Sequence, residues 1–140
     1  MPAAWRLPYR VTNPQLPNSD PRPILPITLE LENRSISTAA LVDSGAMVNV
    51  LPYSVGLALA ADWDSIRIPV RLSGILAEAE ARALVLNAVI GPLGSVRLAF
   101  AWTRHDQVPV ILGQMNFFAE FDICFFRSQL QFELKAKSAS

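Results

Sequence analysis

The chain has 140 residues, of which 51% are hydrophobic and 17% are charged, and its 12 basic and 12 acidic side chains cancel to a net charge of zero. This length predicts one domain with a core of its own. Because no run of Lys or Arg occurs before the last few residues, nucleic acid is not expected as a ligand. No stretch of about eighteen unbroken apolar residues occurs, so no membrane span is expected either.

The inventory of reactive side chains removes several classes of enzyme. The chain has one cysteine, Cys124, and one histidine, His105, which argues against a disulfide framework and against Cys-based or multi-histidine metal sites. Cys124 lies in an apolar run and is expected to be a buried structural thiol, whereas His105 lies in a polar segment typical of a solvated loop. We expect no metal and no cofactor. The amino terminus lacks the apolar core of a signal peptide, so we expect a cytoplasmic protein.

The first 26 residues hold seven of the eleven prolines. This density predicts an extended arm over residues 1–22, without a helix or a central strand. Trp5, Leu7, Tyr9 and Val11 alternate with polar or proline positions, as in an edge strand that docks on the domain. An unattached leader fits the proline content equally well, and the sequence leaves both interpretations open.

Alternation of apolar and polar residues predicts most of the strands that follow. Residues 27–32 and 35–42 are expected to pair as a hairpin, with a turn at Asn33-Arg34. A short strand over residues 48–51 is expected next, and then a short helix over residues 52–59 with a proline at its start.

A second, longer hairpin is predicted over residues 67–90, with its tip near residues 73–77. Residues 66–72 alternate clearly, but residues 77–84 are ambiguous. Their Ala, Glu, Arg and Leu favour a helix, while polar residues at every second position favour a strand. We interpret this segment as a strand. A turn at residues 91–94, a strand over 95–103, a loop over 104–107 and a strand over 108–112 complete this part.

The last predicted element is a hairpin with strands over residues 121–126 and 129–134. Leu130, Phe132 and Leu134 are expected on one face, with Gln131 and Glu133 on the other. Residues 135–140 are expected to be a polar tail. The pattern therefore predicts a mainly β domain over residues 23–134.

An acidic residue follows an apolar strand at residues 39–42, in the sequence Asp43-Ser44-Gly45-Ala46. Apolar residues continue on the far side, so core-type sequence encloses the turn. One interpretation is an Asx-turn, in which the carboxylate accepts hydrogen bonds from backbone N–H groups two residues on. The other is a catalytic carboxylate at the floor of a packed site. The tetrapeptide alone favours the Asx-turn.

A second motif, Val110-Ile111-Leu112-Gly113, stands downstream. The two motifs in this order resemble those of the retropepsin-like aspartic proteases, over about residues 23–134, and Leu-Gly-Gln-x-x-Phe-Phe is most similar to the bacterial branch. The resemblance implies a closed-barrel acid protease fold with one short helix, over residues 114–121, after the second motif. It also favours the catalytic interpretation of Asp43 over a simple turn.

The resemblance implies a role for each matching residue. Asp43 would be catalytic, Ser44 would lock two catalytic loops together, and Gly45 would let the substrate backbone approach beside Ala46. The tip of a flap over the substrate would consist of Ser73, Gly74, Ile75 and Leu76. The second motif would pack behind the catalytic loop through Ile111, Leu112 and Gly113, and apolar walls would come from Val42, Ile111 and Leu112.

Peptide hydrolysis by carboxylates needs two of them about one water apart. The chain has one such motif, so the second Asp43 would come from a second copy on a two-fold axis. The resemblance thus implies an aspartic endopeptidase that acts as a homodimer on a peptide or protein substrate. Its interface is expected at residues 125–134, with residues 5–11 as a second candidate. A non-catalytic dimeric peptide-binding module with the same fold is the alternative.

One departure from the viral members of the family concerns an ion pair. They carry an acidic residue directly after the catalytic loop and an Arg after the second glycine, where this chain has Met47 and Gln114. Both partners are replaced together, so we expect a hydrophobic or hydrogen-bonded substitute and a changed substrate preference.

Overall fold

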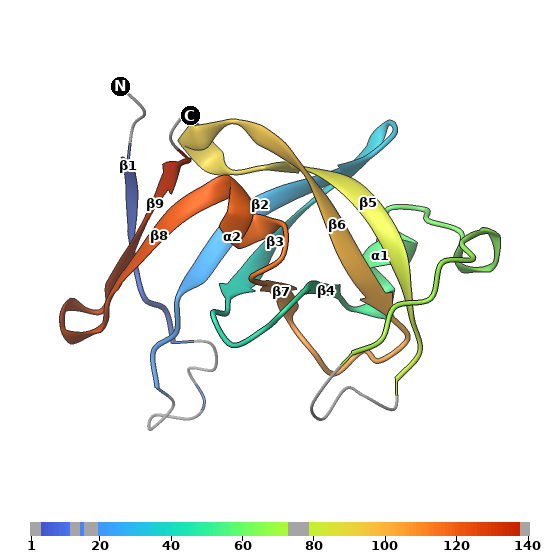
Figure 1. Ribbon diagram of the computed structural model, residues 1–140, viewed down its shortest axis with the longest axis horizontal. Coiled ribbons are helices and arrows are strands. Elements are labelled where there is room, and N and C mark those ends of the chain that lie inside the picture. Colours follow the sequence, from blue (N-terminus) through green and yellow to red (C-terminus); the bar gives the residue numbers. More distant parts are fainter. Residues whose placement is uncertain (1–3, 12–14, 16–19, 73–78, 138–140) are drawn as a thin grey trace.

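The computed structural model describes residues 4–11, 15, 20–72 and 79–137. Among these residues, six strands close into a barrel in the order β2-β3-β7-β4-β6-β5, and three form a sheet in the order β1-β9-β8 (Figure 1). The strands are β1 (Ala4–Pro8), β2 (Ile24–Leu31), β3 (Arg34–Val42), β4 (Asn49–Leu51), β5 (Ala81–Val89), β6 (Ser95–Thr103), β7 (Val110–Leu112), β8 (Phe121–Phe126) and β9 (Gln131–Ala136). Helical turns are short: α1 (Tyr53–Ala58), α2 (Phe117–Glu120), and the 3-10 turns η1 (Trp63–Ser65), η3 (Gly91–Leu93) and η4 (Arg127–Gln129). The predicted mainly β, closed-barrel class is confirmed.

The hairpin of β2 and β3 begins the barrel. It pairs from Ile24 opposite Leu41 to Leu31 opposite Arg34, so β2 starts three residues before the predicted strand and includes Pro26. On its other side, β2 pairs with β5 only from Thr28 to Glu30. Pro26 thus lies where the strand has a single neighbour, which is where a residue without an N–H group is tolerated.

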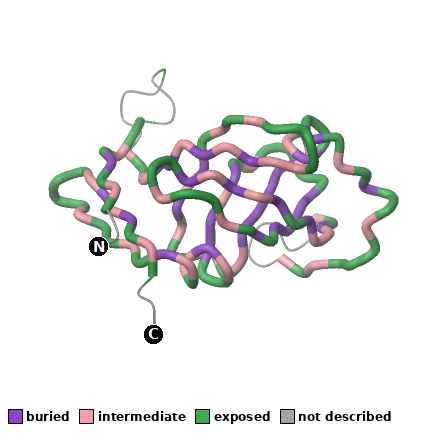
Figure 2. Tube along the Cα trace, turned by 90° about the horizontal axis from the view of Figure 1, so that it is seen from above, coloured by how far each residue is buried: buried purple, intermediate pink, exposed green. Residues whose placement is uncertain are grey.

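The core fills the middle of the barrel, and Figure 2 shows the buried stretches running through the centre of its strands with exposed loops around them. Helix α1 packs on Trp102, which is fully buried. The Trp102 ring stacks on Tyr53 with centroids 5.6 Å apart. A Cβ atom at Gly56 would lie 2.2 Å from Cε2 of Trp102, so only glycine lets the helix approach this closely.

The long hairpin predicted over residues 67–90 forms only in part. Strand β5 confirms the strand interpretation for Ala81–Val89, but residues 66–72 make a single bridge, Pro69 to Arg82, instead of a strand. Pro69 has no N–H to donate, and the Arg82 guanidinium donates to the carbonyl oxygens of Trp63 and Ile66, which holds this segment in an irregular path. The expected flap tip, Ser73 to Leu76, lies outside the described residues.

Helix α2 follows the second motif as predicted, but it is shorter than residues 114–121. The reason lies in the three residues before it. The N–H of Gln114 donates to the Ala46 carbonyl at 2.9 Å and the N–H of Met115 to the Met47 carbonyl at 2.8 Å, while Asn116 has a positive φ of 79°. The positive φ of Asn116 is incompatible with a right-handed helix, so α2 begins only at Phe117.

The terminal hairpin of β8 and β9 is confirmed, with two corrections. Leu130 does not join Phe132 and Leu134 on the buried face, because it has a φ of 53° after η4 and is 39% exposed. Cys124 is exposed, so the expectation of a buried thiol is wrong. Strand alternation buries Phe121 and partly buries Ile123, which turns Cys124 to the opposite face.

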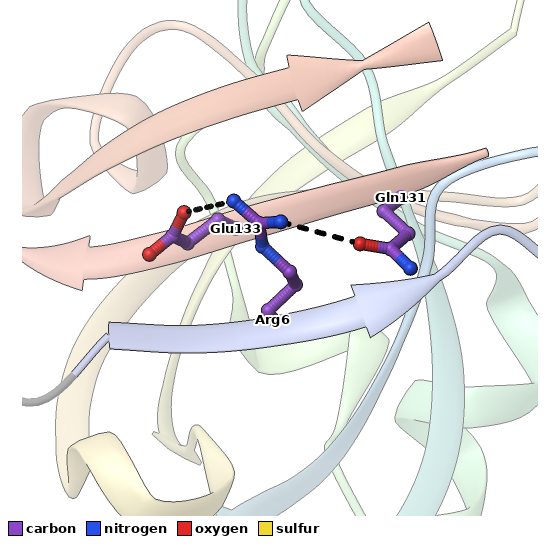
Figure 3. Close-up of polar contacts among 3 residues, drawn as sticks. All are labelled: Arg6, Gln131 and Glu133. Carbon is purple, nitrogen blue, oxygen red and sulfur yellow. Dashed lines mark hydrogen bonds and ion pairs between the residues drawn. The ribbon is translucent and has the colours of Figure 1, made fainter. Parts of the chain in front are cut away.

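Within the proline-rich arm, residues 4–8 dock as an edge strand, which agrees with the first of the two interpretations of this sequence. Strand β1 pairs antiparallel with β9, which runs to Ala136 and so takes in two residues of the expected tail. Arg6 lies opposite Glu133 and contacts its carboxylate at 3.2 Å, and a second nitrogen donates to Gln131 at 3.4 Å (Figure 3). An exposed ion pair contributes at most about 1 kcal/mol, so the apolar contacts matter more.

Two apolar side chains of β1 make these contacts. Leu7 is 8% exposed, and a Cβ atom at Gly91 would lie 2.6 Å from the Trp5 ring. Strand β1 is therefore part of the folded domain. In the described part of the chain, no helix is long and apolar enough to cross a membrane.

A chain ending at Phe126 is predicted not to fold. It loses β9, and with it Phe132 and Leu134, which are both 0% exposed, and β1 loses its only partner strand among the described residues. Burial of two such side chains contributes roughly 3–6 kcal/mol, comparable to the whole stability of a small domain. Circular dichroism and urea unfolding should show this loss, whereas a chain ending at Lys137 should unfold like the full chain. A folded, cooperative chain ending at Phe126 would contradict the assignment of β9 to the core.

Candidate active site

The two motifs meet side by side, as the family resemblance implies. Strands β3 and β7 are parallel, with Val42 opposite Leu112 in the register. The N–H of Asp43 then donates to the Leu112 carbonyl at 3.0 Å, which fixes the residue at the end of the strand. Parallel pairing brings the two strand ends to the same edge, so Asp43 and Gly113 begin their loops together.

The loop after β3 is a tight turn held by the acid itself. The Gly45 N–H donates to Oδ1 of Asp43 at 2.9 Å, and the Ala46 N–H donates to the Asp43 carbonyl at 3.1 Å. A Cβ atom at Gly45 would lie 3.3 Å from Oδ1, which is tight. This is the Asx-turn expected from the tetrapeptide. It occupies one carboxylate oxygen, and within the described residues no hydrogen bond reaches Oδ2.

Gly113 crosses directly behind this loop. A Cβ atom there would lie 2.6 Å from the Val48 carbonyl oxygen and 2.8 Å from the Ala46 carbonyl oxygen. Any side chain would push the loop away, so the second motif needs glycine for a steric reason. The buried N–H of Gly113 donates to Oδ1 of Asn49 at 2.8 Å.

Asn49 joins the strands behind the loop. Its side chain is 0% exposed, and its Nδ2 donates to the Ala99 carbonyl at 3.0 Å and to Oδ1 of Asn116 at 3.3 Å. The same Asn116 oxygen accepts from the Ala99 N–H at 2.6 Å. One amide thus ties β4, β6 and the segment after β7 together, with both its oxygen and its nitrogen in use.

The expected substitute for the viral ion pair is a hydrogen bond. Nε2 of Gln114 donates to the Ser44 carbonyl at 2.7 Å, so a neutral amide binds the loop that begins at Asp43. Met47 has no such role, because it is 59% exposed and lines a cavity. Gln114 therefore holds the loop through the Ser44 carbonyl, while the Met47 side of the loop faces the cavity.

Asp43 is half-buried and borders two cavities. The first, of about 480 Å³, is lined by Asp43 together with Arg22, Leu41, Gly45, Ala46, Met47, Val48, Val50, Arg71, Leu72, Gln107, Val108, Pro109 and Ile111. The second, of about 530 Å³, is lined by Asp43, Ser44, Tyr9, Arg22, Pro23, Leu41, Val42, Phe125 and Arg127. Of the expected apolar walls, Ile111 and Val42 each line one cavity. Leu112 lines neither and is fully buried in the core, which corrects its expected role.

The comparisons with known proteins bear on this arrangement. No family model matches the chain, and no curated protein matches it significantly. The crystal structure of a retropepsin-like aspartic protease from Rickettsia conorii is similar, with a TM-score of 0.65 and 17% sequence identity, over 97% of this chain and 94% of that chain. The chain has the retropepsin-like fold. At this identity the likeness establishes the fold and not the activity.

Within the retropepsin-like fold, sequence reasoning missed residues that act through distant contacts. Asn49 appeared only as one position of a short strand, although an amide between Val48 and Val50 is a usable signal for a satisfied buried polar group. Asn116 gave no signal, since its positive φ follows from the crossing of the chain. Arg22 and Arg71, which line the first cavity, lie far apart in sequence, and only the fold brings them together.

Asn49→Ala is predicted to lower the free energy of unfolding by roughly 1–3 kcal/mol, because it leaves the buried N–H of Gly113 without an acceptor. Asn87→Ala is the matched control. Asn87 also loses a side-chain hydrogen bond, to Glu30, but it is only partly buried, so the expected loss is below about 1 kcal/mol. Urea unfolding measures both. Equal losses in the two variants would show that Asn49 is no special support of the site.

Proposed function

We propose that this chain is an aspartic endopeptidase that acts as a homodimer, with Asp43 of each copy forming one catalytic pair. The observation that supports this most is the state of Asp43. Its carboxylate borders two cavities, and one oxygen is held by the Gly45 N–H at 2.9 Å. A carboxylate fixed in orientation at a cavity can activate water once a second acid is close.

A second copy is needed on chemical grounds. One carboxylate takes a proton from the attacking water while the other gives a proton to the peptide carbonyl oxygen, and two adjacent carboxylates do this because they share one proton. The cavity lined by Ser44, Tyr9 and Phe125 lies on the same side of Asp43 as the terminal sheet. Phe125 is 37% exposed there, and this apolar surface suits contact with a second copy.

Each residue of the loop then has a role in the pair. Ser44, which is exposed beside Asp43, would hydrogen-bond to the facing loop of the other copy. Gly45 and Ala46 would leave room for the substrate backbone along the first of the two cavities. Gln114 would keep the loop in position through the Ser44 carbonyl. The segment 73–76 remains proposed as the flap by resemblance alone.

Asp43→Asn is predicted to abolish peptide cleavage, by at least about a thousandfold in kcat, while the chain stays folded. The amide can still accept the Gly45 hydrogen bond, but it can neither share nor transfer the catalytic proton. Cleavage of a fluorogenic peptide library measures the activity, and urea unfolding measures the fold. Unchanged turnover in the variant would rule out Asp43 as the catalytic acid.

Mixing and dilution provide the controls for this variant. If the site is shared between copies, an excess of the Asp43→Asn chain should suppress wild-type activity by forming inactive mixed dimers, and activity per wild-type chain should fall on dilution. Activity that is proportional to chain concentration down to a sedimentation-verified monomer would contradict a shared site. A folded dimer that binds peptides without cleaving them would instead support the binding-module alternative.

The proposed pair also predicts a bell-shaped dependence of kcat on pH, with its maximum on the acid side of neutral. As pH rises past the higher pKa of two coupled carboxylates, the shared proton is lost and with it the general acid, so the rate falls. Below the lower pKa of the pair, the general base is protonated and the rate falls again. Stopped assays from pH 3 to pH 8 measure the profile. A rate that climbs steadily through neutral pH would contradict the carboxylate pair.

A further inference from the structure

The cavities beside Asp43 are lined by arginines, although the chain as a whole has a net charge of zero. Arg22 and Arg71 line the first cavity, of about 480 Å³, and Arg22 and Arg127 line the second. Asp43 is the one acidic residue among the described residues that line these two cavities. The positive charge is therefore a local feature of this site and does not follow from composition.

The backbone of Arg22 is fixed next to the loop that begins at Asp43. Arg22 and Arg10 exchange two backbone hydrogen bonds of 2.8 Å, which tie the segment before β2 to the docked arm. The following residue, Pro23, accepts a hydrogen bond of 3.0 Å from the N–H of Val42, directly before Asp43. The backbone of Arg22 is therefore held in a defined position close to Asp43.

The backbone of Arg71 is positioned by β5. The preceding residue, Val70, donates from its N–H to the Ala81 carbonyl at 3.0 Å. One residue earlier, Pro69 bridges to Arg82. Arg71 therefore enters the cavity from the base of the irregular segment, while Arg22 enters it from the arm side of the chain.

Neither the Arg22 nor the Arg71 guanidinium group has an acidic partner in the part of the chain that the structure describes, which leaves out residues 73–78, and both side chains are exposed. Arg6 pairs with Glu133 and Arg82 binds two carbonyl oxygens. Exposed arginines elsewhere, such as Arg97, also form no ion pair among the described residues, so what distinguishes Arg22 and Arg71 is that they line one cavity beside Asp43. Two arginines at one cavity without an ion pair in the described part of the chain bring no structural benefit there, because like charges repel each other.

We propose that Arg22 and Arg71 are specificity-determining residues that select peptides with Asp or Glu close to an apolar scissile position. The remaining lining explains the apolar part, since Leu41, Val48 and Ile111 form a wall of the same cavity. A guanidinium binds a carboxylate through two parallel hydrogen bonds, which favours an acidic side chain over its amide. This inference rests on the proposed peptidase function and adds the substrate class to it.

The charges of the assembled site favour the same substrates. In a homodimer the two Asp43 side chains share a proton and carry about one negative charge together, while the two copies contribute two Arg22 and two Arg71 guanidinium groups. The excess is positive, so an incoming carboxylate is attracted in spite of the catalytic acids. Because the arginines are exposed, the attraction should weaken as salt is added.

The test compares matched peptides that differ at one flanking position, which carries Glu, Gln or Lys in turn, around an apolar scissile pair. At the best position, the full chain should cleave the Glu peptide with a kcat/KM about three to ten times that of the Gln peptide. Arg22→Gln and Arg71→Gln should each lower this ratio, and the double variant should bring it to about one. Arg97→Gln is the matched control, since Arg97 is exposed on β6 and lines neither cavity; it should leave the ratio unchanged.

The outcomes separate this inference from the proposed function. Cleavage without a Glu preference, or a preference that survives the double variant, overturns the inference and leaves the peptidase proposal standing. If no peptide is cleaved, the same Glu and Gln peptides are titrated against Asp43→Asn full-length chain by fluorescence anisotropy. Tighter binding of the Glu peptide that is lost in the double variant then supports the inference without the catalysis. Equal binding of both peptides, or stronger binding of an oligonucleotide than of any Glu peptide, overturns it.

Discussion

The structure depends on one close crossing, where Gly113 passes behind the loop that begins at Asp43. The backbone comes so near that a Cβ atom would lie 2.6 Å from the Val48 carbonyl oxygen. Such an approach removes water from the Gly113 N–H, and Oδ1 of Asn49 replaces it at 2.8 Å. The same contact therefore requires glycine at position 113 for steric reasons and asparagine at position 49 as the acceptor for the buried N–H of Gly113.

The segments around this crossing have irregular backbone structure. Gln114 and Met115 donate their N–H groups to the loop carbonyls of Ala46 and Met47, and the positive φ of Asn116 then delays the start of α2 to Phe117. Asn116 has a positive φ, and in this conformation its side chain forms hydrogen bonds with Ala99 and Asn49. The position of Asp43 is thus determined by the same hydrogen bonds that hold the barrel together, so a change that loosens the barrel here also moves the acid.

Sequence patterns predicted most of the strands because apolar alternation is a local signal, whereas the packing of the second motif behind the loop was implied only by the family resemblance. They failed where a distant side chain decides. Residues 66–72 alternate like a strand, yet the Arg82 side chain donates hydrogen bonds to the carbonyl oxygens of Trp63 and Ile66. Cys124 sits in an apolar run, but the pairing of β8 turns it outward. Asn49 has partners 50, 64 and 67 residues away, and no short window contains them.

The two interpretations of Asp43 that the sequence offered are compatible in three dimensions. The Asx-turn uses Oδ1 to accept the Gly45 N–H, and this hydrogen bond fixes the plane of the carboxylate without engaging Oδ2 among the described residues. A turn and a catalytic site require the same first step, a carboxylate held in one orientation at the end of a strand. They differ in what faces the second oxygen. For a turn, solvent is sufficient, whereas catalysis needs another acid within reach of a shared proton. Folding of one chain therefore prepares half of such a site, and chemistry would begin only when a second loop of the same kind completes it.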